Sequence, residues 1–136
     1  MSSGSIHGND TNDVSFKAKA ALAANYVAVK KDTTVNTVAV CTANTDETIG
    51  FIQQTQATAD GPVPVRTEGF SLGLAGAGGW TIGDKLTPAS ATTSGELVTT
   101  TTAGNLVCAI AMDTVSAAEN GEIQIISPAQ LYSTFA

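Results

Sequence analysis

The stretch that decides the fold is residues 67–98, TEGFSLGLAGAGGWTIGDKLTPASATTSGELV. Single apolar residues alternate there with threonine, serine and glycine, and few charges interrupt them. Four glycines fall between positions 73 and 79. Glycine suits turns and close backbone approaches, and it disfavours a helix. Together with the β-prone triplet at 80–82 and the turn residues that follow it, this pattern predicts short strands joined by tight turns.

The composition of the whole chain points in the same direction. Its 136 residues fit one domain, and only 13% are charged and 5% aromatic, so the core must come from aliphatic side chains that favour strands. We predict an all-β fold, a small barrel or sandwich of short antiparallel strands. Residues 1–14 are expected to be a flexible N-terminal arm, residues 15–128 the β domain, and residues 129–136 a tail beyond a strand that Pro128 ends.

Two segments of the chain repeat one pattern. Residues 49–65 read IGFIQQTQATADGPVPV and residues 109–125 read AIAMDTVSAAENGEIQI, at a constant separation of 60. Each has an apolar run, a polar loop, an acidic or amide residue followed by glycine, and an alternating strand. A glycine in the left-handed region would close each turn at 60–61 and 120–121. The repeat predicts two hairpin-like units and internal pseudo-symmetry.

The first of these copies carries Pro62 and Pro64 at alternate positions of its strand. Proline cannot donate a ladder hydrogen bond, so this strand is expected at a sheet edge, which a second subunit could shield. The residues that we expect to form oligomer or core contacts are Pro62, Pro64, Leu72, Leu74, Trp80 and Ile82.

The charge balance argues against nucleic acid and membrane partners. Six Lys and Arg residues against twelve Asp and Glu give a net charge of −6 and a pI near 4.4, so phosphate backbones should repel the chain. There is no polybasic run and no apolar segment long enough to cross a bilayer. The first residues lack the pattern of a signal peptide, so we expect the chain to be made and kept in a cytosol.

The residues that catalysis or metal binding would require are scarce. His7 is the only histidine and lies in the expected arm, while Cys41 and Cys108 fall in strand-like runs typical of buried, reduced thiols. No zinc or calcium spacing occurs. The glycines at 73–79 lack the Lys-Ser/Thr ending of a phosphate loop. We therefore expect no enzyme activity, no metal and no cofactor.

The order of motifs from Thr48 onward resembles that of tailed-phage capsid decoration proteins, also described as head cement proteins. The succession that carries the resemblance is TIGFI, ADGPVPVRTEG, GWTIGDKL, TTSGELV, VCAIAMDTVSAAENGEIQI and a closing ISP. It covers roughly residues 35–128. The triplet Ala109-Ile110-Ala111 stands where such proteins usually carry a glycine.

The resemblance implies a virion protein on the outer surface of the expanded phage head. Such a protein binds the major capsid protein, stabilises contacts between capsid subunits, and often forms a homotrimer. An arm ordered on the shell would make the contact, and the arm residues that we assign to it are Ile6, Val14 and Phe16. The alternative is a β-domain of a phage fibre or adhesin that recognises glycans or a host surface. In that case an exposed aromatic residue, with Trp80 the candidate, would stack on the sugar.

Overall fold

The structure is a computed structural model that describes residues 13–90 and 95–132. These residues form ten β-strands and no helix, which confirms the all-β prediction. No helix in the described ranges could therefore span a membrane. The strands are β1 Asp13–Ala18, β2 Ala28–Lys31, β3 Thr37–Val40, β4 Thr48–Ile52, β5 Pro62–Arg66, β6 Phe70–Leu74, β7 Lys85–Pro88, β8 Leu97–Thr99, β9 Leu106–Ala111 and β10 Asn120–Leu131.

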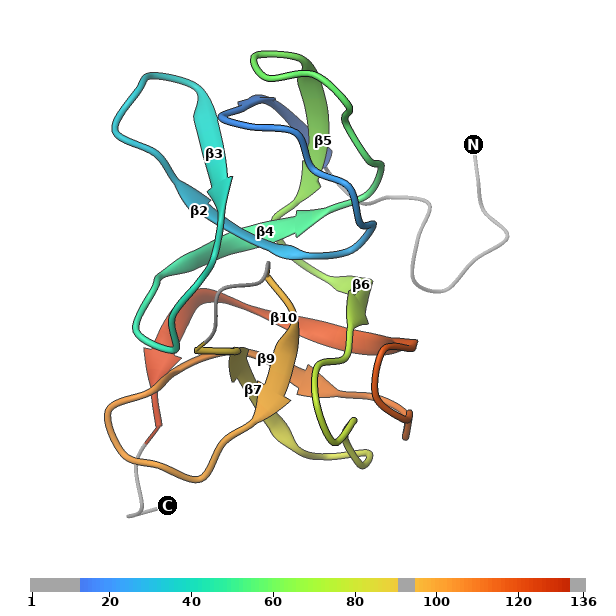
Figure 1. Ribbon diagram of the computed structural model, residues 1–136. Helices are drawn as coiled ribbons and strands as arrows, with labels where there is room; N and C mark the ends of the chain where they lie inside the picture. Colours follow the sequence, from blue (N-terminus) through green and yellow to red (C-terminus); the bar gives the residue numbers. More distant parts are fainter. Residues whose placement is uncertain (1–12, 91–94, 133–136) are drawn as a thin grey trace.

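The ten strands divide into two units of five that are stacked on each other (Figure 1). Unit 1, residues 13–66, is a closed barrel in the order β1-β3-β2-β4-β5. Unit 2, residues 70–131, is a sheet in the order β6-β10-β9-β7-β8. Read as a ring, the second order repeats the first, with β6 to β10 in the places of β1 to β5.

The two units close their rings in the same way but to different extents. In unit 1, β1 and β3 form a short parallel ladder that includes the pair Ala18 and Val38. In unit 2 the equivalent strands, β6 and β8, are joined by a single parallel bridge between Ala75 and Leu97. The remaining strand pairs in both units are antiparallel, so the predicted antiparallel barrel is correct except at these closures.

Isolated antiparallel bridges show that the path between the strands is repeated as well. Leu22 pairs with Gln56 in unit 1, and Trp80 pairs with Val115 in unit 2. Trp80 follows Leu22 by 58 residues, and Val115 follows Gln56 by 59. The predicted pseudo-symmetry is therefore present, and it relates two complete five-stranded units rather than two hairpins.

The predicted separation of 60 residues does not match the equivalent turns. In these two turns the residues with positive φ are Asp60 (67°) and Ala118 (68°), which are 58 apart. Neither Gly61 nor Gly121 has a positive φ. Each turn closes by the same backbone hydrogen bond. The residue that follows the positive-φ residue donates its N–H to the carbonyl of the residue three positions before that donor. In β5 and β10 the separation of 60 kept the strand faces correct, because equivalent residues are 58 apart and a shift of two residues preserves the face. In β4 and β9 the equivalent residues Ile52 and Ala111 are 59 apart, so the separation of 60 is one residue off and exchanges the faces there.

The two prolines of β5 are not at a sheet edge. β5 pairs with β1 along its whole length and with β4 at Val65 and Arg66. Pro62 and Pro64 occupy alternate positions opposite β1, where the ladder directs backbone nitrogens away from the partner strand. Their missing N–H groups therefore cost no bond to β1, and on the other side of β5 the ladder with β4 covers only Val65 and Arg66.

Both ends of the expected β domain lie elsewhere in the structure. β1 begins at Asp13, so Val14 and Phe16 belong to a barrel strand. β10 continues through Pro128 to Leu131, with a shift of register between Ile125 and Gln130 that accommodates the proline. Residues 1–12, with Ile6 and His7, and residues 133–136 lie outside the described residues.

The protein has two core clusters, and one of them is shared by both units. One cluster fills unit 1, with Ile52, Val63 and Val65 among its members. The other fills unit 2 but also includes Ala28, Cys41 and Phe51 of unit 1. The outward faces of β2 and β4 are thus buried against unit 2, and the predicted single domain is consistent with this shared core.

Backbone hydrogen bonds cross the same junction. Gly95, with a φ of 72°, donates its N–H to the carbonyl of Cys41 and accepts from the N–H of Ala28, both at 2.9 Å. Leu74 donates to the carbonyl of Tyr26 at 3.2 Å. A loop of unit 1 therefore enters the ring of unit 2 beside its single closing bridge.

Candidate interaction surfaces

The described side chains offer little for chemistry. Cys41 and Cys108 are buried, and burial raises the pKa of Cys41 to about 11 and that of Cys108 to about 12. Both thiols are therefore protonated at neutral pH and hard to reach, which makes them poor nucleophiles. Within residues 13–90 and 95–132 no group of three or more His, Cys, Asp and Glu side chains could hold a metal ion.

Ion pairs of the described residues lie in unit 1. Lys19 bonds to Asp32 at 3.0 Å and Lys30 bonds to Asp46 at 3.1 Å. The hydrogen bond from Lys19 lowers the pKa of Asp32 to about 2. The pKa of Asp46 is also lowered: burial raises it, but hydrogen bonds from the Thr42 N–H and from Lys30 outweigh that effect.

The two units carry different net charges. Residues 13–66 contain five Lys and Arg and five Asp and Glu, so unit 1 is balanced. Residues 70–131 contain Lys85 as their only basic residue against five acidic ones, so unit 2 carries a net charge of −4. The acidity of the protein is thus concentrated on one half of the molecule.

The residues that we expected to make oligomer or core contacts do not form one patch. Trp80 is only 3% exposed and lies in the unit 2 core. Ile82 is 62% exposed and Leu72 is 37% exposed. Pro62 is exposed, while Pro64 and Leu74 are half-buried, and Leu74 packs against the unit 1 core. Core and surface roles are therefore divided among them.

A groove of about 350 Å³ lies where the two units meet. It combines aromatic and aliphatic side chains with an arginine, a glutamate and two neutral polar groups. We call it the junction groove, and its lining residues are Tyr26, Gln53, Arg66, Phe70, Ser71, Leu72 and Glu122. Leu72 alone of these was among the residues that we expected to make contacts.

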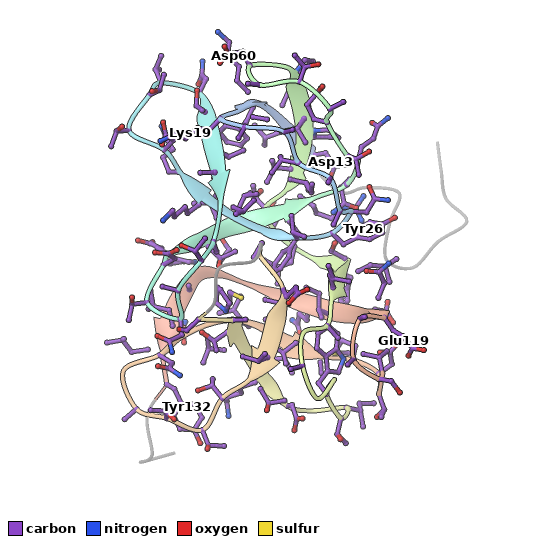
Figure 2. All side chains as sticks on the ribbon, in the orientation of Figure 1. Asp13, Lys19, Tyr26, Asp60, Glu119 and Tyr132 are labelled. Atoms are coloured by element: carbon purple, nitrogen blue, oxygen red, sulfur yellow. The ribbon has the colours of Figure 1, made fainter. Side chains whose placement is uncertain are left out.

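Arg66 ties the junction groove to the start of β1. Its Nε donates to Asp13 Oδ1 at 2.9 Å and its Nη2 to Asp13 Oδ2 at 3.4 Å, while Nη1 donates to the carbonyl of Phe70 at 3.3 Å. One guanidinium thus holds the first described residue, the last residue of β5 and the first residue of β6 together. Figure 2 shows Asp13 and Tyr26 on the same side of the molecule, with Tyr26 nearer to the junction.

Sequence reasoning missed the junction groove because its residues come from both units. Tyr26 has a φ of 63°, and no local signal marks an aromatic residue for the left-handed region. The one available signal was Arg66, a single arginine at the end of an apolar strand four residues before Phe70. The contact of Arg66 with Asp13 depends on the ring closure of β1 with β5.

Comparison of the sequence with protein-family models and with curated proteins finds no match. Comparison of the fold with solved structures finds the head fiber gp8.5 N base of bacteriophage phi29. The TM-score is 0.57, the sequence identity is 17%, and the alignment covers 88% of this chain and 98% of that one. The two proteins therefore share a fold across nearly their whole described lengths.

Proposed function

We propose that this protein is a structural component of a tailed-phage head, which binds the outer surface of the expanded shell and stabilises contacts between major capsid subunits. The observation that carries the proposal is the shared fold with the phi29 head fibre base, which spans 88% of this chain. The motif order that resembles capsid decoration proteins supports the same assignment independently.

The charge distribution supports a place on the outside of the shell. Unit 2 carries a net charge of −4 and the whole chain −6, so packaged DNA would repel it. A role in holding subunits together requires surfaces and no reactive group. We accordingly propose that the protein is not an enzyme and works without a cofactor.

We assign the contact with the major capsid protein to residues 1–12, with Ile6, and to the neighbouring start of β1. Val14 is 42% exposed and can extend that contact. Phe16 packs against the unit 1 core, so of the two expected β1 residues Val14 alone is kept in the proposal. A homotrimer would join three weak contacts into one strong attachment through effective concentration.

The test is co-sedimentation of the purified protein with empty expanded heads. A variant that lacks residues 1–12 leaves β1 complete, so its fold and native mass should match those of the full chain. We expect the full chain to bind and the shortened one to bind at least about tenfold more weakly. Equal binding by both would exclude the arm assignment, and no binding by the full chain would exclude the function.

A second function, recognition of glycans by a fibre domain, is favoured by one observation, that the similar solved structure is the base of a fibre. Trp80 cannot serve as its sugar platform, because it is 3% exposed. Tyr26, half-buried in the junction groove, is one candidate aromatic residue, and half-buried Tyr132, which lines another groove, is a second. A glycan-array signal that Tyr26→Ser abolishes would reverse the order of the two proposals.

A further inference from the structure

We propose that copies of this chain bind each other head to tail, with a basic corner of unit 1 in one copy seated on an acidic corner of unit 2 in the next. The inference names the contact surfaces of the homotrimer and so rests on that part of the proposed function. Three features of the described residues carry it: the opposite charges of the two corners, an exposed aliphatic side chain in each, and their positions on the molecule.

The basic corner is formed by the turn between β2 and β3 and the neighbouring part of β1. Lys17 of β1 donates its backbone N–H to the carbonyl of Asn36 at 2.7 Å, which places it beside the turn, and Lys31 ends β2. Both lysines are exposed, and neither forms an ion pair with a described residue. Lys19 lies there too but is paired with Asp32 at 3.0 Å. Two positive charges are thus available to a partner.

An exposed aliphatic residue and a groove accompany these charges. Val35 lies in the turn and is 75% exposed. A groove of about 300 Å³ lies beside the turn, and its lining residues are Ser15, Phe16, Lys17, Asn36, Asp60 and Pro62. With the segments 15–19, 31–36 and 58–62 counted together, Asp60 included, the basic corner has a net charge of +1. Such a surface suits a partner that is acidic and partly apolar.

The acidic corner is formed by two loops of unit 2, residues 75–84 between β6 and β7 and residues 112–119 between β9 and β10. The loops lie side by side, because Trp80 and Val115 form a bridge and the Ile82 N–H donates to Thr114 Oγ1 at 3.0 Å. They contain no basic residue and three acidic ones, Asp84, Asp113 and Glu119. The acidic corner therefore has a net charge of −3, opposite in sign to the basic corner.

The carboxylates of the acidic corner are held by backbone groups and not by bases. Each accepts a backbone N–H of a nearby residue at 2.9 to 3.2 Å, and none forms an ion pair with a described residue. Lys85 follows the first loop, but its Nζ lies over the ring of Tyr132, 5.7 Å from the centroid. Ile82, which we expected to make a contact, is 62% exposed in the same loop. The acidic corner thus offers fixed negative charge beside an apolar side chain.

The positions of the corners favour a second copy as the occupant. Figure 1 shows the turn between β2 and β3 at the upper left, away from unit 2, and the loops of the acidic corner at the lower right of unit 2. One chain cannot bring its own two corners together, whereas a second copy supplies the complementary one. Val35 of one copy and Ile82 of the next would cover each other, which removes apolar surface from water. Because the two surfaces differ, the contact is heterologous and uses both corners of a chain.

The first test is the native mass of the purified protein without shells, measured by light scattering over a concentration series. One chain has a mass of 13.7 kDa, and we expect larger particles at low salt. In about 0.5 M salt the association should weaken at least about fivefold, because salt screens exposed charges. A single-chain mass throughout the series, or association that salt strengthens, would overturn the proposal.

The second test blocks one corner at a time. Val35→Glu places a negative charge in the basic corner and Ile82→Arg places a positive charge in the acidic corner. Each variant alone should associate at least about tenfold more weakly than the unmodified chain. An equimolar mixture of the two should associate again, because the intact acidic corner of the first meets the intact basic corner of the second. Glu47→Lys reverses an exposed charge outside both corners and should leave the native mass unchanged.

Thermal denaturation of each variant shows that it is folded, since both substitutions are at exposed sites. Variants that associate as well as the unmodified chain, a mixture that stays dissociated, or an equal loss in Glu47→Lys would each contradict the head-to-tail contact. Shells take no part in these measurements. The contact can therefore fail while the protein still binds expanded heads, and it can hold for a protein that does not bind them.

Discussion

Unit 1 and unit 2 follow the same backbone path with different side chains. Leu22 of unit 1 stands where unit 2 has Trp80, and Asp60 stands where unit 2 has Ala118. Unit 1 is neutral, has ion pairs and closes by a ladder, whereas unit 2 is acidic and closes by one bridge that a loop of unit 1 supports. The difference shows that strand order and turn geometry define the fold, while the surfaces of each unit are open to specialisation.

The largest loss in the free energy of unfolding is expected at the junction. Unit 2 needs this junction to support its ring closure, whereas unit 1 closes by its own ladder. A Cβ at Gly95 would lie 2.6 Å from the Ala28 carbonyl oxygen, at a φ of 72°. Gly95→Ala should therefore destabilise the protein by about 3–5 kcal/mol in chemical denaturation, because both overlap and strain oppose it. Gly104→Ala is the control, since φ there is 98° and nothing lies near. Gly104→Ala should lower the free energy of unfolding only by the backbone strain, about 1–2 kcal/mol. Equal losses would refute the role of the junction.

The next-largest change in stability is expected at Gly121, and Gly61, 60 residues earlier, serves as its comparison. A Cβ at Gly121 would lie 2.7 Å from Asp113 Oδ1 and 2.9 Å from Trp80 Cζ2, whereas a Cβ at Gly61 would meet only the end of the Gln56 side chain. Gly121→Ala should cost about 1–3 kcal/mol and shift the fluorescence of the single tryptophan. Gly61→Ala should cost less than Gly121→Ala, about 1 kcal/mol, because the Gln56 side chain can move and loses only its hydrogen bonds to Pro62 and Thr58. A larger loss for Gly61→Ala would contradict the account.

A smaller effect of opposite sign is expected at the equivalent turns. Ala118 has a φ of 68° without any feature that favours it, while Asp60 has a φ of 67°. Aspartate tolerates the left-handed region better than alanine does. Ala118→Gly should raise the free energy of unfolding by about 0.5–1 kcal/mol, and Asp60→Gly should change it little. Thermal denaturation checks both, and a greater gain at Asp60 would show that the turns are not equivalent.

The smallest effect concerns acid stability of unit 1. The pKa of Asp46 lies below its ordinary value of 3.8, so its contribution is present above that pH and is lost as the pH falls through the lowered pKa. Relative to the unmodified chain, Asp46→Asn should reduce the free energy of unfolding by about 1 kcal/mol or less at neutral pH. The free energies of unfolding of the variant and of the unmodified chain should become equal as the pH is lowered. Glu47→Gln removes a neighbouring exposed carboxylate and is the control. A gap that persists at low pH would exclude the ion pair as its source.

Local features of the fold were predictable from the sequence, and features that join distant segments were not. Glycine, proline and β-branched residues predicted short strands, and the repeat predicted pseudo-symmetry. The separation of 60 was wrong at the turns because Asp-Gly and Asn-Gly look alike in sequence, while hydrogen bonds place the positive φ at Asp60 and Ala118. The prolines of β5 suggested an edge because ring closure is not visible in a single strand.

The sequence indicated single residues that could be exposed. It could not indicate which of them come together to form a surface. Leu72 and Ile82 are both exposed, as contact residues should be, and Leu72 lies in the junction groove. That groove exists because a loop at Tyr26 and a strand end at Arg66 approach β6 across the junction. Trp80, the most conspicuous side chain in the sequence, fills the unit 2 core because Gly121 leaves room for it.

The measurement that tests the central claim most directly is the temperature at which empty expanded heads break open, with and without saturating amounts of the protein. The account predicts that bound protein raises this temperature, because each copy holds neighbouring capsid subunits together. Heads that bind the protein but open at an unchanged temperature would contradict the stabilising role and favour a fibre base. Heads that do not bind it would contradict the proposed function as a whole.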